Sequence, residues 1–193
     1  MFKFLSFGLL IAAFAAPTVT VKLRLGDRFF IESVLTDIFG PAATVTTTKY
    51  IFKPASLYGG PCDIYEQVRI GQGAQDFADP RGACPGGKTA ASLLVVGVSS
   101  MLRQGYVTRA CELLATQPAT LEYALRRLFP DGVYESPNPM NLAAAFQLFN
   151  PERNPSPGIV AALQQLESRE PDLKKRWSLI YLTLCMDPQW QVI

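Results

Sequence analysis

Histidine is absent from all 193 residues of this sequence. Because no imidazole is available as a general base, metal ligand or haem ligand, hydrolases with a histidine-containing triad are excluded, as is haem attachment through Cys-x-x-Cys-His. An excess of either charge is also lacking, since 18 Lys and Arg residues balance 16 Asp and Glu residues. This balance argues against a protein whose main role is to bind nucleic acid.

Long hydrophobic runs are scarce, and the apolar stretch near the amino terminus is short. Residues 1–15 are typical of a secretory signal peptide: Lys3 is followed by apolar residues 5–14, and Ala13 and Ala15 form an A-x-A cleavage site. This stretch is shorter than the roughly 20 residues of a membrane-spanning helix, which favours a cleaved signal over a retained anchor. We expect residues 16–193 to form a single domain in the periplasm, at the cell surface or outside the cell, with membrane contact only through the signal.

The sequence has four cysteines, Cys62, Cys84, Cys111 and Cys185. An even number in an exported chain favours disulfides over free thiols, and four cysteines allow three pairings. We favour Cys62–Cys84, because both lie in one Gly/Pro-rich loop, together with Cys111–Cys185 between two helices. In the chain-entropy treatment these bridges would contribute about 3 and 4.5 kcal/mol.

Two segments have the pattern of β-strands. Residues 18–25 alternate strictly between apolar and polar side chains, and residues 44–52 are rich in β-branched and aromatic side chains. We expect them to pair as a small two-stranded ribbon. Between them, Asp27 can cap a helix that ends at Gly40 and Pro41.

From residue 89 onward the apolar spacing is helical. We expect helices at residues 89–103, 106–116, 118–128, 138–150, 156–168 and 171–187, with Gly105 separating the first two. Glu122 and Arg126 are spaced for an exposed i,i+4 ion pair, whereas Lys174, Lys175 and Arg176 are typical of a solvated face. The predicted fold is therefore a mostly α, disulfide-stapled domain of six to seven helices with a small β-ribbon and a long irregular loop.

That loop spans residues 53–88 and is dense in Gly and Pro. Long loops in compact domains are often functional, although a surface excursion pinned by a Cys62–Cys84 disulfide explains the pattern equally well. Residues 82–89 match the G-x-x-x-x-G-K-[ST] phosphate loop from Gly82 to Thr89. Because residues 75–81 are not a buried strand, we interpret the match as coincidental and predict no nucleotide site.

The same loop carries four acidic side chains, Asp63, Glu66, Asp76 and Asp79. Carboxylates in an irregular exported segment suit calcium, and paired carboxylates can hydrolyse glycosides. The D-x-[DN]-x-[DN]-G pattern is missing, so solvated loop acids are the simpler interpretation. No cofactor is predicted, and calcium is the candidate cation.

Two further stretches carry a family resemblance. Arg24-Leu25, Phe30, Ser33-Val34 and residues 37–40 match a pattern of Arg-Leu, aromatic, Thr/Ser-Val and Asp-Leu-Leu-Gly, with one extra residue after Val34. Residues 177–190 are similar to a closing helix in which leucines precede Ser/Asp-Pro and an aromatic. Together they resemble helical segments of exported bacterial proteins of the planctomycete cytochrome-associated type. The resemblance implies a helical envelope or extracellular protein, and the missing haem motif puts a redox role in doubt.

These observations predict a non-catalytic exported protein that acts as a structural or adaptor subunit of an envelope assembly. The expected partners are other envelope or cell-surface proteins, or a second copy, and not nucleic acid. Candidate contacts are Val19, Val21 and Leu23, which could add as a strand to a neighbour, and Trp190 in an aromatic tail that should dock on the body or on a partner. The alternative is a carboxylate-based hydrolase or a calcium-dependent binding protein that uses the loop at residues 62–84.

Overall fold

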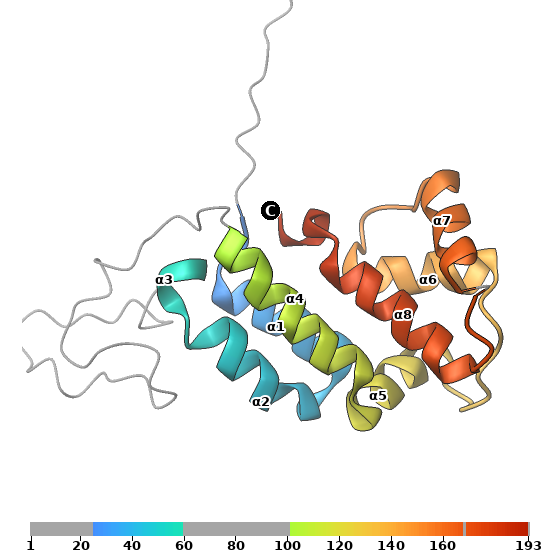
Figure 1. Cartoon of the computed structure of the whole chain (residues 1–193), viewed down its shortest axis with the longest axis horizontal. Coiled ribbons are helices and arrows are strands. Elements are labelled where there is room, and N and C mark those ends of the chain that lie inside the picture. The colour runs from blue at the N-terminus through green and yellow to red at the C-terminus, as the bar shows by residue number, and fades with distance from the viewer. Residues whose placement is uncertain (1–24, 60–100, 168, 193) are drawn as a thin grey trace, which may run out of the picture.

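The computed structural model describes residues 25–59, 101–167 and 169–192, which are mostly helical (Figure 1). The helices are α1 (Arg28–Phe39), α2 (Thr44–Thr47), α3 (Ala55–Tyr58), α4 (Met101–Thr116), α5 (Pro118–Leu128), α6 (Pro139–Phe149), α7 (Pro157–Glu167) and α8 (Leu173–Met186). Single turns of 3-10 helix follow at Pro41–Ala43 and Pro188–Gln191, and a π-helical turn spans Thr48–Phe52. Within these ranges no helix is long and apolar enough to cross a membrane.

Side-chain caps set where these helices begin. The Asp27 carboxylate accepts hydrogen bonds from the backbone N–H groups of Phe29 and Phe30, both at 3.0 Å. Asn138 does the same for the first turn of α6, and Asp172 for the first turn of α8. These contacts satisfy N–H groups that have no partner inside the helix.

The core is built around α8, which packs between α4 on one side and α6 and α7 on the other (Figure 1). Trp177 and Tyr181 of α8 are fully buried, and their polar atoms are paired. The Trp177 indole N–H donates to the Glu135 carbonyl and the Tyr181 hydroxyl donates to the Ala124 carbonyl, both at 2.9 Å. The buried aromatic side chains of α8 thus also make specific hydrogen bonds to neighbouring segments.

The Cys111–Cys185 disulfide joins α4 to α8, as the sequence predicts, with the two Cα atoms 5.7 Å apart. Both cysteines are completely buried. The bridge lies where the two helices already pack, so it fixes an apolar interface from within.

The predicted β-ribbon is wrong for residues 44–52, which form α2 and the π-helical turn. Their β-branched side chains favour a strand locally, but Thr47 and Ile51 lie four residues apart and are both fully buried, which is helical spacing. The Arg28 guanidinium also donates to the Phe52 carbonyl at 3.3 Å and lies 4.4 Å from the Phe52 ring centroid. Tertiary packing against α1 therefore overrides the local preference.

Of the other proposed strand, residues 18–25, only Leu25 lies within the described residues. It forms an isolated antiparallel bridge with Val192, and the Gly26 N–H donates to the Gln191 carbonyl at 2.6 Å. One bridge is not a strand pair, so the ribbon has no support in the part of the chain that the structure describes.

The helix break predicted at Gly105 is also wrong, because α4 continues through it from Met101 to Thr116. Gly105 is exposed, and a Cβ there would have nothing within 4 Å. The burial of Val107, Cys111 and Leu114 on one face holds the helix together across this residue. The remainder of the helix predicted at 89–103 lies outside the described residues.

The helices predicted at residues 118–128, 138–150, 156–168 and 171–187 are confirmed, with small differences at their ends. α5, α6 and α7 begin at Pro118, Pro139 and Pro157, and α8 follows its Asp172 cap. Proline suits the first helical position because its missing N–H would have no helical partner there.

Candidate functional site

Most residues proposed from the sequence as sites lie outside the described ranges. These are Cys62, Cys84, Asp63, Glu66, Asp76, Asp79, the 82–89 segment, Val19, Val21 and Leu23. They stay predictions. Among the residues that are described, no group of three or more His, Cys, Asp or Glu side chains could hold a metal ion.

Trp190 is described, and its side chain is only 3% exposed. Its indole N–H donates to the Cys185 carbonyl at 2.9 Å, and its ring packs against Phe149 with centroids 6.0 Å apart. The tail thus docks on the body, the first of the two expected positions. In this position the indole is not on the surface for a partner to contact.

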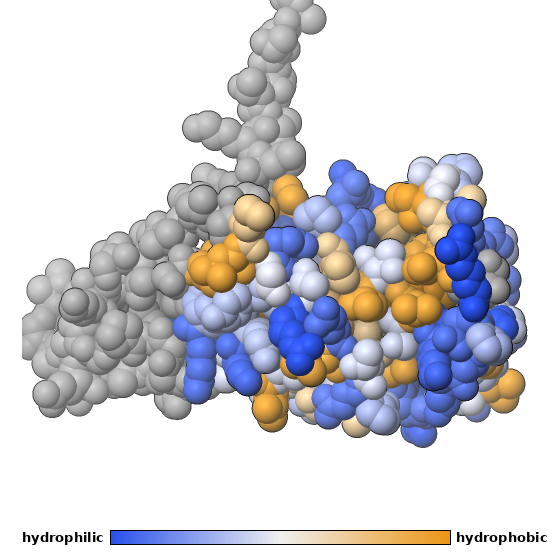
Figure 2. All heavy atoms as spheres, viewed as in Figure 1, coloured by the Kyte–Doolittle hydropathy of each residue, from blue (hydrophilic) through white to orange (hydrophobic). Residues whose placement is uncertain are grey.

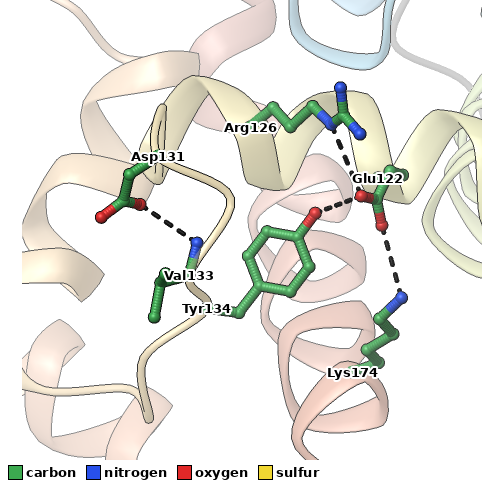
Figure 3. Close-up of polar contacts among 6 residues, drawn as sticks. All are labelled: Glu122, Arg126, Asp131, Val133, Tyr134 and Lys174. Atoms are coloured by element: carbon green, nitrogen blue, oxygen red, sulfur yellow. Dashed lines mark hydrogen bonds and ion pairs between the residues drawn. The ribbon is translucent and has the colours of Figure 1, made fainter.

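The main charged cluster of the described residues gathers around Glu122 of α5 and is drawn in Figure 3. The Glu122 carboxylate accepts a short hydrogen bond from the Tyr134 hydroxyl. It also pairs with Lys174 of α8 at 3.4 Å and with Arg126 of α5 at 3.5 Å. We call these four residues the Glu122 cluster; it ties α5, the loop after α5 and the first turn of α8 together.

Local sequence explains how each member reaches the cluster. Glu122 and Arg126 are one helical turn apart on α5, and Lys174 is in the first turn of α8. After α5 the chain reverses at Gly132, whose φ of 76° is in the left-handed region that glycine favours. In that turn the Asp131 carboxylate accepts from the Val133 N–H at 3.1 Å, which directs the next residue, Tyr134, back toward α5 (Figure 3).

The cluster shifts the pKa values of Glu122 and Tyr134 in opposite directions. The hydrogen bond from Tyr134 lowers the pKa of Glu122, with further lowering by Lys174 and Arg126. The same hydrogen bond raises the pKa of Tyr134 above its ordinary value of 10, because the phenolate would face a carboxylate. The pKa values of Glu122 and Tyr134 are therefore both shifted away from neutral pH, whereas a general acid or base works best with a pKa near the operating pH.

Beside this cluster lies an open groove of about 630 Å³ between the end of α4, α5 and α8. We call it the α5–α8 groove; its lining residues are Thr116, Pro118, Ala119, Leu121, Glu122, Leu125, Lys174, Lys175 and Ser178. Its floor is apolar, since Pro118, Ala119, Leu121 and Leu125 form it. The Ser178 hydroxyl donates to the Ala115 carbonyl at 2.8 Å, so this polar floor atom is already paired.

The rim of the groove is charged. Lys174 and Lys175 are exposed on the α8 side and Glu122 is half-buried on the α5 side. In the face drawn in Figure 2, hydrophilic residues gather over the lower right of the body, the region that the first turn of α8 occupies in Figure 1. An apolar floor with a polar, solvated rim is the usual anatomy of a protein contact site.

A second hollow, of about 560 Å³, lies over α1 and includes Glu32, Asp37 and Tyr123. Its Asp37 carboxylate accepts from Arg127 of α5 at 2.5 Å, which fixes α1 to α5. A third hollow, of about 410 Å³, lies beside Phe149 and Trp190. Both of these hollows are smaller than the α5–α8 groove and have a more polar lining, so the groove is the candidate functional site among the three.

Sequence reasoning found part of this site. The Glu122–Arg126 pair is confirmed at its i,i+4 spacing. The Lys174–Lys175 run is exposed as predicted, but its position beside an apolar floor was missed. Tyr134 was also missed; the Pro130-Asp131-Gly132 turn is the signal that places it, although a turn alone does not identify the side chain it faces.

Comparisons with protein-family models, with curated proteins and with solved structures found no match to this chain. The resemblance to planctomycete cytochrome-associated proteins therefore stays a prediction. A functional assignment has to come from the geometry of the groove and of the Glu122 cluster.

Proposed function

We propose that this chain is a non-catalytic helical subunit or adaptor of an assembly in the periplasm or at the cell surface, and that it binds a partner through the α5–α8 groove. The signal-like residues 1–15 support export. The buried Cys111–Cys185 disulfide supports it independently, because such bonds persist in oxidising compartments and are rare in the cytosol.

The observation that carries the proposal is the groove itself, an apolar floor bordered by exposed lysines. Burial of apolar surface is the main favourable contribution to protein association, and a charged rim adds orientation and selectivity. The adjacent Glu122 cluster supports binding over proton transfer, because it lowers the pKa of its carboxylate and raises the pKa of its phenol, both away from neutral pH.

The test is affinity purification of the tagged full-length protein from its native envelope, with and without a blocked groove. Ala119 is exposed on the groove floor, so Ala119→Arg places a long charged side chain there. Ala161→Arg is the matched control, because Ala161 is exposed on α7, away from the groove. We expect a stoichiometric partner with the wild type and with Ala161→Arg, and its loss with Ala119→Arg. Failure of the wild type to retain any stoichiometric partner would contradict the adaptor proposal.

The competing prediction places calcium-dependent binding or hydrolysis at Asp63, Glu66, Asp76 and Asp79, which lie outside the described residues. Thermal unfolding in EDTA and in excess calcium separates the two. We expect equal melting temperatures, because the proposed adaptor role needs no metal. A rise in the melting temperature with calcium, by mass action on the folded state, would favour the competing prediction.

A further inference from the structure

The charged groups at the rim of the α5–α8 groove that can still pair with a ligand are positive. Glu122 is the acidic residue of the lining, and its carboxylate already accepts from Tyr134, Lys174 and Arg126. The nearby Asp172 carboxylate caps α8 by accepting from the Lys175 backbone N–H at 2.8 Å. Both carboxylates are thus occupied.

The cationic side chains of the cluster and the rim can still bind an anion. The side chains of Arg126 and Lys174 are 70% and 63% exposed, and Lys175 is exposed at the rim. Each ammonium group has three hydrogen-bond donors, so the one contact of Lys174 with Glu122 leaves donors that can reach a ligand. A ligand entering the groove therefore meets cations that can accept another anion, and carboxylates that are already paired.

The floor of the groove suits one large apolar side chain. Leu125 is fully buried and Leu121 nearly so beneath the floor, while Pro118 and Ala119 are exposed on it. A volume of about 630 Å³ exceeds that of a leucine or aromatic side chain, which leaves room for the backbone that carries it. The open shape favours a segment laid across the groove over a small molecule enclosed by it.

We propose that the α5–α8 groove binds an acidic, amphipathic segment of a partner protein. A leucine or aromatic side chain of that segment packs on the floor against the exposed Pro118 and Ala119, and flanking Asp or Glu side chains pair with Lys175 and Lys174. This inference rests on the proposed adaptor function and specifies the chemistry of the partner.

Charge complementarity separates this occupant from the alternatives. A basic segment would face Lys174 and Lys175, with Glu122 already engaged by three donors. A second copy joined through the same groove would bring identical surfaces together, because a two-fold interface is self-complementary. Such a dimer would therefore bring two lysine-bearing rims into the same interface, and neither copy would supply an unpaired carboxylate from the lining to balance them.

The Glu122 cluster also contributes to binding by holding the cations in place. Lys174 is oriented by Glu122 and lies 5.7 Å from the centroid of the Tyr134 ring, a cation–π contact. A side chain that is ordered before binding loses less conformational entropy when the partner arrives. The rim is thus partly organised in the free protein.

The experiment uses two short synthetic helical peptides as probes, identical in their leucines but flanked by glutamates in one and by lysines in the other. Fluorescence anisotropy measures their affinities for the full chain at low and at physiological ionic strength, and amide chemical shifts locate the site. We expect only the glutamate peptide to bind, with salt-dependent affinity and with shifts confined to α5 and the first half of α8. Lys175→Glu should weaken binding by about tenfold, or about 1.4 kcal/mol, and Ala119→Arg should abolish it.

Lys53→Glu is the matched control, because Lys53 is an exposed residue directly after the π-helical turn, outside the groove lining. It changes the net charge by the same amount as Lys175→Glu. The proposal is overturned if the lysine peptide binds as tightly, if Lys53→Glu weakens binding as much as Lys175→Glu, or if the glutamate peptide fails to bind at the groove. Should the peptide fail while a native partner is still lost with Ala119→Arg, the adaptor function would stand and the acidic partner would be wrong. Circular dichroism of each variant confirms that it is folded.

Discussion

Glu122 joins three parts of the chain that are separated in sequence, because its carboxylate receives Arg126 from its own helix, Tyr134 from the following loop and Lys174 from α8. Surface ion pairs taken singly contribute little to stability. A carboxylate that also accepts a hydrogen bond from a half-buried tyrosine, whose ring packs 6.1 Å from that of Phe129, is more strongly constrained. The residue therefore organises the rim of the groove as well as contributing to the fold.

The first prediction concerns the pH dependence of this contribution. Because the pKa of Glu122 is lowered in the folded state, its stabilisation is present above the ordinary carboxyl pKa of about 4.5 and is lost as the pH falls through the lowered value. We expect Glu122→Gln to reduce the free energy of unfolding by up to about 1 kcal/mol at pH 7, and by much less at pH 3. Urea unfolding at both pH values measures this.

Glu152→Gln is the control, because Glu152 is an exposed carboxylate of the loop between α6 and α7. It should change the free energy of unfolding little at either pH. An equal loss for Glu122→Gln at pH 7 and pH 3 would show that the substitution acts through packing and not through charge.

At the scale of the element, two glycines illustrate what local sequence can and cannot predict. Gly40 ends α1 with a φ of 78°, and a Cβ there would lie 2.5 Å from the Tyr123 ring of α5. Gly105 lies in the middle of α4, where a Cβ would meet nothing within 4 Å. The sequence predicts both as helix breaks, but only Gly40 is one.

The second prediction follows from this contrast. Gly40→Ala should destabilise the protein by about 1–3 kcal/mol, because the left-handed conformation is strained for alanine and the methyl group would displace Tyr123. Gly105→Ala should stabilise it by about 0.5–1 kcal/mol, because alanine loses less backbone entropy in a helix. Thermal unfolding of the two variants measures both; a loss of stability in Gly105→Ala would contradict the continuous α4.

The sequence predicts helices best where a boundary signal and an apolar period coincide. The Asn138 cap with Pro139 locates α6 closely, and the apolar period that starts after Pro171 locates α8, whose cap in the structure is Asp172. The strand prediction for residues 44–52 failed because it rested on β-branched and aromatic composition alone. Their conformation is determined by packing against α1, through the contact with Arg28 and the burial of Ile51. The groove could not be predicted at all, because it depends on how α5 and α8 meet.

At the scale of the whole molecule, the Cys111–Cys185 disulfide closes a covalent loop across a sequence separation of 74. It spans α5, α6 and α7, so every helix between the two cysteines lies inside the closed loop. A loop of this length restricts the unfolded chain strongly.

The third prediction is that the Cys111→Ala/Cys185→Ala double variant loses about 4.5 kcal/mol of unfolding free energy, the value the chain-entropy treatment gives for such a loop. Because both cysteines are buried between packed helices, we expect its helical content at low temperature to remain that of the wild type. Urea unfolding followed by circular dichroism measures both. An unchanged free energy would mean that the bridge adds strain to the native state that cancels its effect on the unfolded chain.

The bridge between Leu25 and Val192 brings the first and last described residues together on one side of the body. These two residues lie side by side near the end marked C in Figure 1, whereas α5 and the first turn of α8 lie toward the opposite side of the body. A tether joined at either of these residues would therefore start on the side of the body away from the groove. A protein tethered there would present the proposed binding groove away from the tether, toward whatever approaches.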